Sequence, residues 1–245
     1  QTVYRVFEGT REPHRLAVER TAELLGRGGL ALIPTETVYG VAVAVNVFSD
    51  AVPQDTSEPL PWPRDPQVTV NGAAVPALGT GYRRIFTLKQ RELTQTVAWL
   101  VDDAEALDRY GVDIPHEARV LARRCWPGAL TIVVKAALRA DLYARRRRHG
   151  GTSRFGLARG ASAHPRLRQP SCLHQRQYAW QARAASFADV EDRILEGVDL
   201  AVDAGETPCR DASTIVTFKH GELQILRQGA LPASEIERVL SDPMQ

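Results

Sequence analysis

A short polar turn between two apolar runs is the first stretch whose residue types could do chemistry. The tripeptide Thr35-Glu36-Thr37 follows the apolar run 29–33, which is closed by Pro34. Proline cannot donate to a sheet and keeps the preceding residue extended, so this run predicts a buried strand that bends at its end. Hydroxyls and a carboxylate at a strand end can bind a small polar ligand, and Gly40 lets the backbone approach it. An ordinary hydroxyl-rich turn is an equally good interpretation.

Two cations, Lys89 and Arg91, form the second candidate group. They precede the apolar run 96–101, which predicts another buried strand. An arginine can hold a carboxylate or phosphate with two parallel hydrogen bonds, and a lysine acts as a point charge. On its own this spacing is a weak signal, because surface lysines and arginines produce it often.

Composition sets the limits of the fold and of its partners. The 245 residues are 44% apolar and 24% charged, which is typical of one large or two small globular domains. The net charge of +2 gives no overall field that would point to nucleic acid or a membrane. Residues 145–149 are a dense basic run, which is either a solvated loop or a contact for phosphate or RNA.

Three cysteines without a C-x-x-C spacing argue against a disulfide framework and a structural zinc site, and they suit a reducing compartment. No apolar run approaches the roughly 18 residues that a membrane span needs, and the first residues lack a signal-peptide core. We therefore expect a cytoplasmic protein with no metal site of its own and no membrane contact.

The order of elements predicts an α/β fold. Residues 2–8 predict a strand, a helix of about 13 residues follows Pro13, and the strand before the polar turn comes next. Residues 47–82 interrupt this order with prolines and an Asn71-Gly72 hairpin signal. We interpret them as an insertion, which serves as a lid, a flap or a partner surface. Further strands are expected at 96–101, 129–134, 155–158, 198–202, 213–218 and 223–227. Two helices are expected within 102–124, and others are expected to begin at Ser186 and near Ser234.

Six short motifs, in this order along the chain, resemble the YrdC-like family and cover roughly residues 14–240. One motif alone would mean little, whereas the ordered set is specific. The motifs are Gly28-Gly29 with IPTETVYG at 33–40, Arg84-Ile85-Phe86 before Lys89-x-Arg91, WPGALT at 126–131, residues 156–159 before His164-Pro165, STIV at 213–216, and ILRQG at 225–229.

The resemblance implies one domain over residues 1–245, with a twisted mixed sheet curled around a positively charged cavity and helices packed outside. It implies an ATP-dependent synthase that joins threonine, bicarbonate and ATP into threonylcarbamoyl-AMP and pyrophosphate, for later transfer to an adenosine of certain tRNAs. Magnesium would accompany the phosphates. The possible macromolecular partners are a tRNA or a downstream transferase.

The resemblance also implies roles for eight residues. Thr35, Thr37 and Tyr39 would line the amino-acid pocket. The anion-binding residues would be Lys89 and Arg91 for the carboxylate or triphosphate, Arg159 for the nucleotide phosphates, and Ser213 and Arg227 to complete the anion site.

Each of these residues has a plainer interpretation. Tyr39 could be a core aromatic, Arg159 and Arg227 could belong to surface ion pairs, and Ser213 could cap a strand turn.

The chain also departs from the family pattern. The family carries a Ser-x-Asn motif that no part of this sequence contains; either Tyr178-Ala179-Trp180 or Ser171-Cys172-Leu173 takes its place. The family sequence K-G-R-P reads Lys89-Gln90-Arg91-Glu92 here, and Thr217 stands where an aspartate is common. These changes keep the scaffold and alter the lining of the site.

Two functional hypotheses follow. The first is a working synthase of a carbamoyl adenylate, which uses threonine or is specialised for another amine or biosynthetic pathway. The second is a non-catalytic module that binds a nucleotide or RNA, or regulates a partner through residues 47–82.

Overall fold

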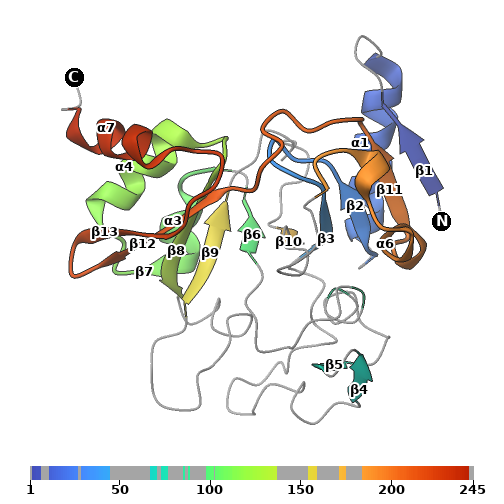
Figure 1. The fold of residues 1–245 in the computed structure, drawn as a ribbon, viewed down its shortest axis with the longest axis horizontal. Helices are drawn as coiled ribbons and strands as arrows, with labels where there is room; N and C mark the ends of the chain where they lie inside the picture. Colours follow the sequence, from blue (N-terminus) through green and yellow to red (C-terminus); the bar gives the residue numbers. More distant parts are fainter. Residues whose placement is uncertain are drawn as a thin grey trace.

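A single mixed sheet dominates the described part of the chain (Figure 1). The computed structural model describes residues 2–6, 11–26, 29–44, 67–70, 73–76, 85, 88, 98–101, 103–136, 154–158, 171–174 and 184–242. The strands are β1 (Thr2–Arg5), β2 (Ala31–Ile33), β3 (Gly40–Ala44), β4 (Gln67–Val70), β5 (Ala73–Pro76), β6 (Ala98–Leu100), β7 (Gly111–Val112), β8 (Leu130–Ala136), β9 (Arg154–Ala158), β10 (Ser171–His174), β11 (Leu200–Asp203), β12 (Thr214–Lys219) and β13 (Glu222–Arg227). The helices are α1 (Arg11–Gly26), α3 (Ala106–Tyr110), α4 (His116–Cys125), the 3-10 helix η2 (Phe187–Asp189), α6 (Asp192–Gly197) and α7 (Ala233–Ser241).

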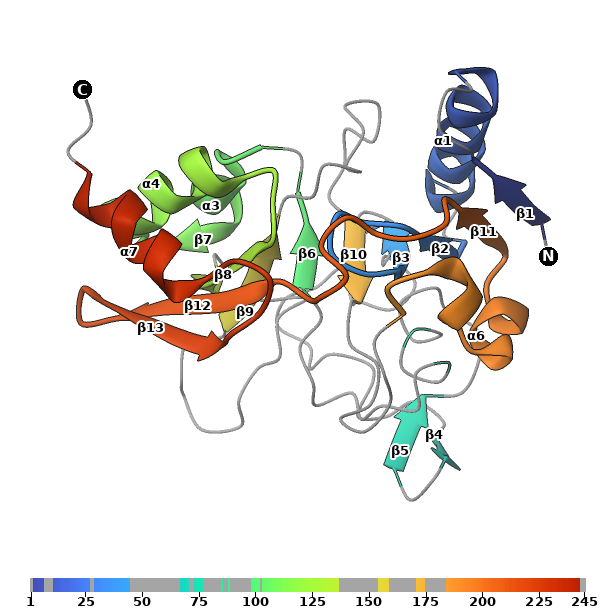
Figure 2. The same ribbon diagram turned by 45° about the horizontal axis from the view of Figure 1, so that its top comes forward.

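The strand order of the large sheet is β1-β11-β2-β3-β10-β6-β9-β8-β12-β13, and β7 pairs with β8. Four neighbouring pairs are parallel, namely β1–β11, β11–β2, β6–β9 and β8–β12. The remaining pairs are antiparallel, so the predicted mixed α/β sheet is confirmed. Figures 1 and 2 show β1, β11 and β2 at one side of the molecule and β8, β12 and β13 at the other.

Alternate residues of the central strands belong to two separate apolar clusters. Leu30 and Leu32 lie in the larger cluster, whereas Ala31 and Ile33 lie in the smaller one. Successive side chains of a strand point to opposite faces, so β2 is buried on both sides. Residues of α1 belong to the smaller cluster, and residues of α4, α6 and α7 belong to the larger one.

Most of the predicted elements are found. The hairpin signal in residues 67–76 is confirmed, because β4 and β5 pair antiparallel as a separate two-stranded sheet. The turn residues Asn71-Gly72 lie outside the described residues. The single-domain organisation and the assignment of 47–82 as an insertion stay predictions.

Two expectations were wrong in detail, and one strand was not predicted. Helix α1 begins at Arg11, before Pro13, because a proline in the first turn loses no helical hydrogen bond. No single helix follows Ser186: a 3-10 turn ends at an extended Val190 and α6 begins at Asp192. Strand β10 falls in a stretch without a clear period, yet it lies between β3 and β6 in the middle of the sheet.

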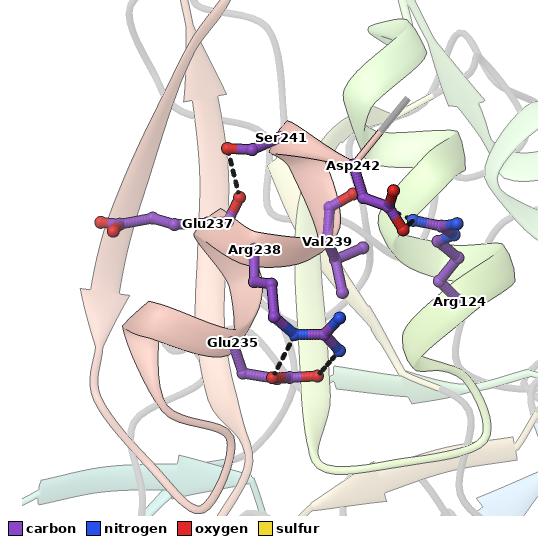
Figure 3. Close-up of polar contacts among 7 residues, drawn as sticks. All are labelled: Arg124, Glu235, Glu237, Arg238, Val239, Ser241 and Asp242. Atoms are coloured by element: carbon purple, nitrogen blue, oxygen red, sulfur yellow. Dashed lines mark hydrogen bonds and ion pairs between the residues drawn. The ribbon is translucent and has the colours of Figure 1, made fainter. Parts of the chain in front are cut away.

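Helix α7 contributes Ile236 and Val239 to the larger cluster, and Figure 3 shows the polar contacts of the same helix. Ile236 on this helix is fully buried and Val239 is nearly so. Its polar contacts are more exposed: Arg124 Nη1 lies 3.1 Å from Asp242 Oδ2, and this carboxylate side chain is 50% exposed. The apolar face of α7, rather than its ion pairs, therefore holds the helix in place.

Replacing Ile236 by alanine should lower the free energy of unfolding by about 2–5 kcal/mol, because it leaves a cavity in the core. Asp242→Asn, which removes the charge of the α4–α7 ion pair, should change it by less than about 1 kcal/mol. Denaturant unfolding of the two variants measures both values. The opposite ranking would contradict this account of how α7 is held.

Candidate active site

The polar turn lies where two parallel strands end side by side. Strand β2 runs parallel to β11, so their carboxyl ends meet at one edge of the sheet. Residues 34–39 follow β2, and the connection that leads from Asp203 to β12 follows β11. The topology thus brings two segments far apart in sequence to one place.

Thr35 and Thr37 form a closed hydrogen-bond network inside the turn. The Thr35 hydroxyl donates to the Val38 carbonyl at 2.7 Å and accepts from the backbone N–H groups of Thr37 and Val38 at 3.2 Å. Its single proton is used by Val38, so Thr37 is the donor in the 2.9 Å contact between the two hydroxyls. Both side chains are buried, and this network fixes the shape of the turn.

Thr207 and Cys209 dock the connection onto the turn. The Thr207 hydroxyl lies 2.7 Å from the Thr37 carbonyl oxygen and 3.0 Å from that of Ala185, so one proton serves two acceptors. The backbone N–H of Cys209 donates to the Glu36 carbonyl at 2.8 Å. The sequence analysis missed Thr207, because a threonine in a polar loop carries no pattern that would reveal it.

Tyr39 ties the start of the same connection to the turn. Its hydroxyl accepts from the Ala204 N–H and donates to the Gly205 carbonyl, both at 3.0 Å. Its ring packs edge-on against Phe187, with the centroids 5.8 Å apart. Burial, the largest cause, together with the nearby Asp203 carboxylate raises the pKa of Tyr39 to about 12, although the Ala204 hydrogen bond opposes the shift. The phenol is therefore neutral at ordinary pH, and its hydroxyl is hydrogen-bonded to the backbone of Ala204 and Gly205.

A second polar group lies at the start of β12. Ser213 precedes the strand, and its hydroxyl lies 2.8 Å from the Thr131 hydroxyl on β8. Arg227 at the end of β13 donates from Nη2 to the Ser213 carbonyl at 2.6 Å and from Nε at 3.2 Å. Ser213 and Thr131 are buried and Arg227 is half-buried. We call Ser213, Thr131 and Arg227 the anion corner.

A β-bulge directs Arg227 into this corner. Ile215 pairs with Arg227 and Val216 pairs with Ile225, so Leu226 is an extra residue on β13. Without the bulge, Arg227 would lie opposite Thr214, whose side chain points to the other face from Ser213. Because bulges redirect the side chains beside them, Leu226 sets the face on which the guanidinium lies.

Gly229 allows the backbone after β13 to approach Ser213 closely. A Cβ atom at this position would lie 2.2 Å from the Ala212 carbonyl oxygen and 2.5 Å from the Ser213 carbonyl carbon. Both contacts are with backbone, which cannot rotate away. Glycine is therefore required for this close approach beside the corner.

Thr217, which stands where an aspartate was expected, is satisfied inside the sheet. Its hydroxyl donates to the Val133 carbonyl at 3.1 Å, and its side chain is buried. The departure from the family pattern at this position therefore leaves no unpaired polar group.

The structure brings together Thr35, Thr37 and Tyr39 at one end of the connection, and Ser213 and Arg227 at the other. Lys89, Arg91 and Arg159 lie outside the described residues, as do Tyr178 and Trp180, so their roles stay predictions. Their described neighbours are informative. Ala158, which precedes Arg159, is registered opposite Thr131 of the anion corner.

Within the described ranges, no three His, Cys, Asp or Glu side chains gather closely enough to hold a metal ion. No helix in that part of the chain is long and apolar enough to span a membrane.

Comparisons with known proteins agree with this fold. The family model named Sua5_yciO_yrdC, described as "Telomere recombination", matches residues 69–165. A threonylcarbamoyl-AMP synthase of Pyrococcus abyssi is 27% identical over 183 residues, which are 72% of this chain and 53% of the relative. A putative threonylcarbamoyl-AMP synthase of Mycobacterium leprae is 28% identical over 217 residues, covering 87% of this chain and 83% of the relative.

Two solved structures share the architecture. The crystal structure of Pyrococcus abyssi Sua5 complexed with L-threonine matches with a TM-score of 0.71 and 22% identity, over 98% of this chain and 61% of that one. The crystal structure of Escherichia coli YciO matches with a TM-score of 0.67 and 14% identity, over 96% of this chain and 99% of that one. The fold is thus that of the Sua5 and YciO structures, and the predicted resemblance to the YrdC-like family is confirmed. It spans about half the length of the Pyrococcus relative.

Replacing Tyr39 by phenylalanine should lower the free energy of unfolding by about 1–3 kcal/mol at neutral pH, because it leaves the backbone groups at 204 and 205 without their partner. Between pH 10 and about 12 the difference from the wild type should shrink. The folded state favours the neutral phenol, so its contribution is complete below the unfolded pKa and is lost as pH rises through the folded one.

Denaturant unfolding over this pH range measures the effect. Tyr4→Phe, on the edge strand β1, is the control and should change stability less. Equal stability of Tyr39→Phe and the wild type at neutral pH would contradict the role given to the hydroxyl.

Proposed function

We propose that the chain is an ATP-dependent synthase of a carbamoyl adenylate, with threonine as the first candidate substrate. The single observation that carries this proposal is the anion corner, where a half-buried guanidinium and two buried hydroxyls meet at strand ends. The names of the two relatives and the L-threonine complex of the Pyrococcus protein support the choice of reaction and substrate.

The reaction needs a site that relieves negative charge. The amine of the amino acid and bicarbonate give a carbamate and water, and a carbamate oxygen then attacks the α-phosphorus of ATP. A new P–O bond forms, the bond to the β-phosphate oxygen breaks, and pyrophosphate leaves. Because both reactants are anions, catalysis depends on cations and N–H groups that hold them in line.

The proposed roles divide the site into two ends. Thr35 and Thr37 shape the amino-acid end, and Tyr39 keeps that turn in register with the connection. Arg227, which donates to the Ser213 carbonyl, belongs to the phosphate end. We place Arg159 at the same end because the resemblance gives it that role and because β9 ends just before it, with Ala158 paired to Thr131. Lys89 and Arg91 would neutralise the reacting carboxylate and phosphates in a basic cavity.

Magnesium is proposed as part of the Mg–ATP substrate. Mg²⁺ commonly binds substrate phosphates, keeps several waters and takes only one or two carboxylates from the protein. It would draw electron density from the phosphates and ease the departure of pyrophosphate. We propose a cytoplasmic protein whose adenylate product passes to a transferase or a tRNA.

One observation favours the second candidate, a non-catalytic module that binds a nucleotide or RNA. The described site hydroxyls are bound to one another or to backbone, and the Ser-x-Asn motif is missing. Such a module would keep the fold and the cations without turnover. Steeply salt-dependent RNA binding would be its signature.

Pyrophosphate release from Mg–ATP and bicarbonate tests the proposal, first with threonine and then with a panel of other amines. Threonine-dependent release should fall about 100-fold or more in Lys89→Ala and in Arg91→Ala, because each removes a charge from the reacting anions. Chelation of Mg²⁺ should abolish it.

Arg238→Ala, which removes an exposed partner of Glu235 on α7, should leave release unchanged. Release with another amine alone would identify a specialised synthase. No release with any amine from folded protein would refute the synthase and favour the binding module.

A further inference from the structure

Leu88, the residue before Lys89, is anchored in the core. Leu88 and Ile85 both have helical backbone. Ile85 is fully buried, and Leu88 packs against the larger apolar cluster. The chain therefore enters the Lys89-Gln90-Arg91 segment from a fixed point.

Helix α6 holds that fixed point through two contacts from one of its faces. Arg193 Nη1 donates to the Leu88 carbonyl oxygen at 2.6 Å. Gly197 lies four residues later on the same face, and a Cβ atom there would lie 2.2 Å from Leu88 Cδ1. The guanidinium thus holds the backbone of Leu88, and the glycine makes room for its side chain.

Glu191 fixes the direction of Arg193. Arg193 Nε donates to Glu191 Oε2 at 2.7 Å, and the two side chains are only 33% and 25% exposed. The other oxygen, Oε1, is buried and has no hydrogen-bond partner in the part of the chain that the structure describes. A partly buried ion pair with an unsatisfied oxygen adds little net stability, so stability alone does not account for it.

The Leu88 carbonyl and the Lys89 N–H belong to one rigid peptide unit, because the peptide bond is planar. A guanidinium that holds this carbonyl therefore also orients the start of the Lys89 backbone. We propose that Arg193, aligned by Glu191, is a positioning residue for Lys89 and Arg91. This inference rests on the proposed function, in which those two cations neutralise the reacting anions.

Pyrophosphate release by Arg193→Ala is the first test. A displacement of the cations by about 1 Å should lower kcat/KM about 10- to 100-fold. Arg193→Lys should recover part of the loss, since a lysine can reach the carbonyl or Glu191 but lacks the planar fork that reaches both. Because Arg193 acts through Lys89 and Arg91, adding Arg193→Ala to a variant that already carries both Lys89→Ala and Arg91→Ala should lower the rate little further.

Arg119→Ala is the matched control. Arg119 likewise joins a carboxylate, Asp108, and a backbone carbonyl, Ile114, but it does so from α4 and makes no hydrogen bond to Leu88 among the described residues. Its loss should leave kcat/KM within about twofold of the wild type, because it costs stability alone. An equal loss of kcat/KM in Arg119→Ala, or a full further loss when Arg193→Ala is added to the Lys89→Ala and Arg91→Ala pair, would overturn the proposal.

Hydrogen exchange tests the positioning without turnover. Backbone amides of residues 89–91 should exchange faster in Arg193→Ala than in the wild type or in Arg119→Ala. Unchanged exchange would overturn the positioning role, whatever the activity. Faster exchange in Arg193→Ala, combined with a wild type that releases no pyrophosphate, would support the positioning and refute the proposed reaction instead.

Discussion

The chain segment between β11 and β12 constrains the shape of the sheet. β11 is second and β12 ninth in the strand order, seven strand spacings apart. In a flat sheet these spacings would span about 34 Å. The eleven Cα steps from Asp203 to Thr214 reach at most about 40 Å when fully extended. Left-handed residues at Gly205 and Arg210 shorten this reach, so the connection leaves little slack between the two sides of the sheet.

The connection also explains how the hydroxyls of the site are used. At one end of the connection, Tyr39 binds the backbone of the connection and Thr207 binds the backbone of the polar turn. At the other end, Arg227 binds the carbonyl of Ser213. These contacts satisfy buried backbone groups that would otherwise be costly. The same residues thus fix the distance between the two ends of the proposed site. Preorganisation of this kind is what a reaction between two anions requires.

Much of the fold could be predicted from the sequence, because it depends on local signals. Apolar runs indicated β2, β6, β8 and β12, and Asn71-Gly72 indicated the β4–β5 hairpin. The ordered motifs indicated the family. In the site, the resemblance assigned Ser213 and Arg227 to the same place, and the structure has them in contact. The partners of Tyr39 on the connection were not predicted.

The elements that were missed depend on tertiary context. β10 is only four residues long, and its sequence, Ser-Cys-Leu-His, has little strand propensity; it is held by pairing with a strand on each side. The bulge at Leu226 has no local signature, because an extra exposed leucine reads as part of an ordinary strand. Thr207 and Arg193 act on carbonyls far away in the sequence, which no spacing rule can reveal.

The identity of the product tests the central claim most directly. Isotopically labelled bicarbonate, supplied with Mg–ATP and threonine, should give an AMP conjugate that carries both the amino acid and the label, as detected by mass spectrometry. A carbamoyl adenylate retains the bicarbonate carbon, whereas an aminoacyl adenylate or simple ATP hydrolysis does not. The account predicts a labelled conjugate. AMP or an unlabelled conjugate as the sole product, or no product from folded protein, would contradict it.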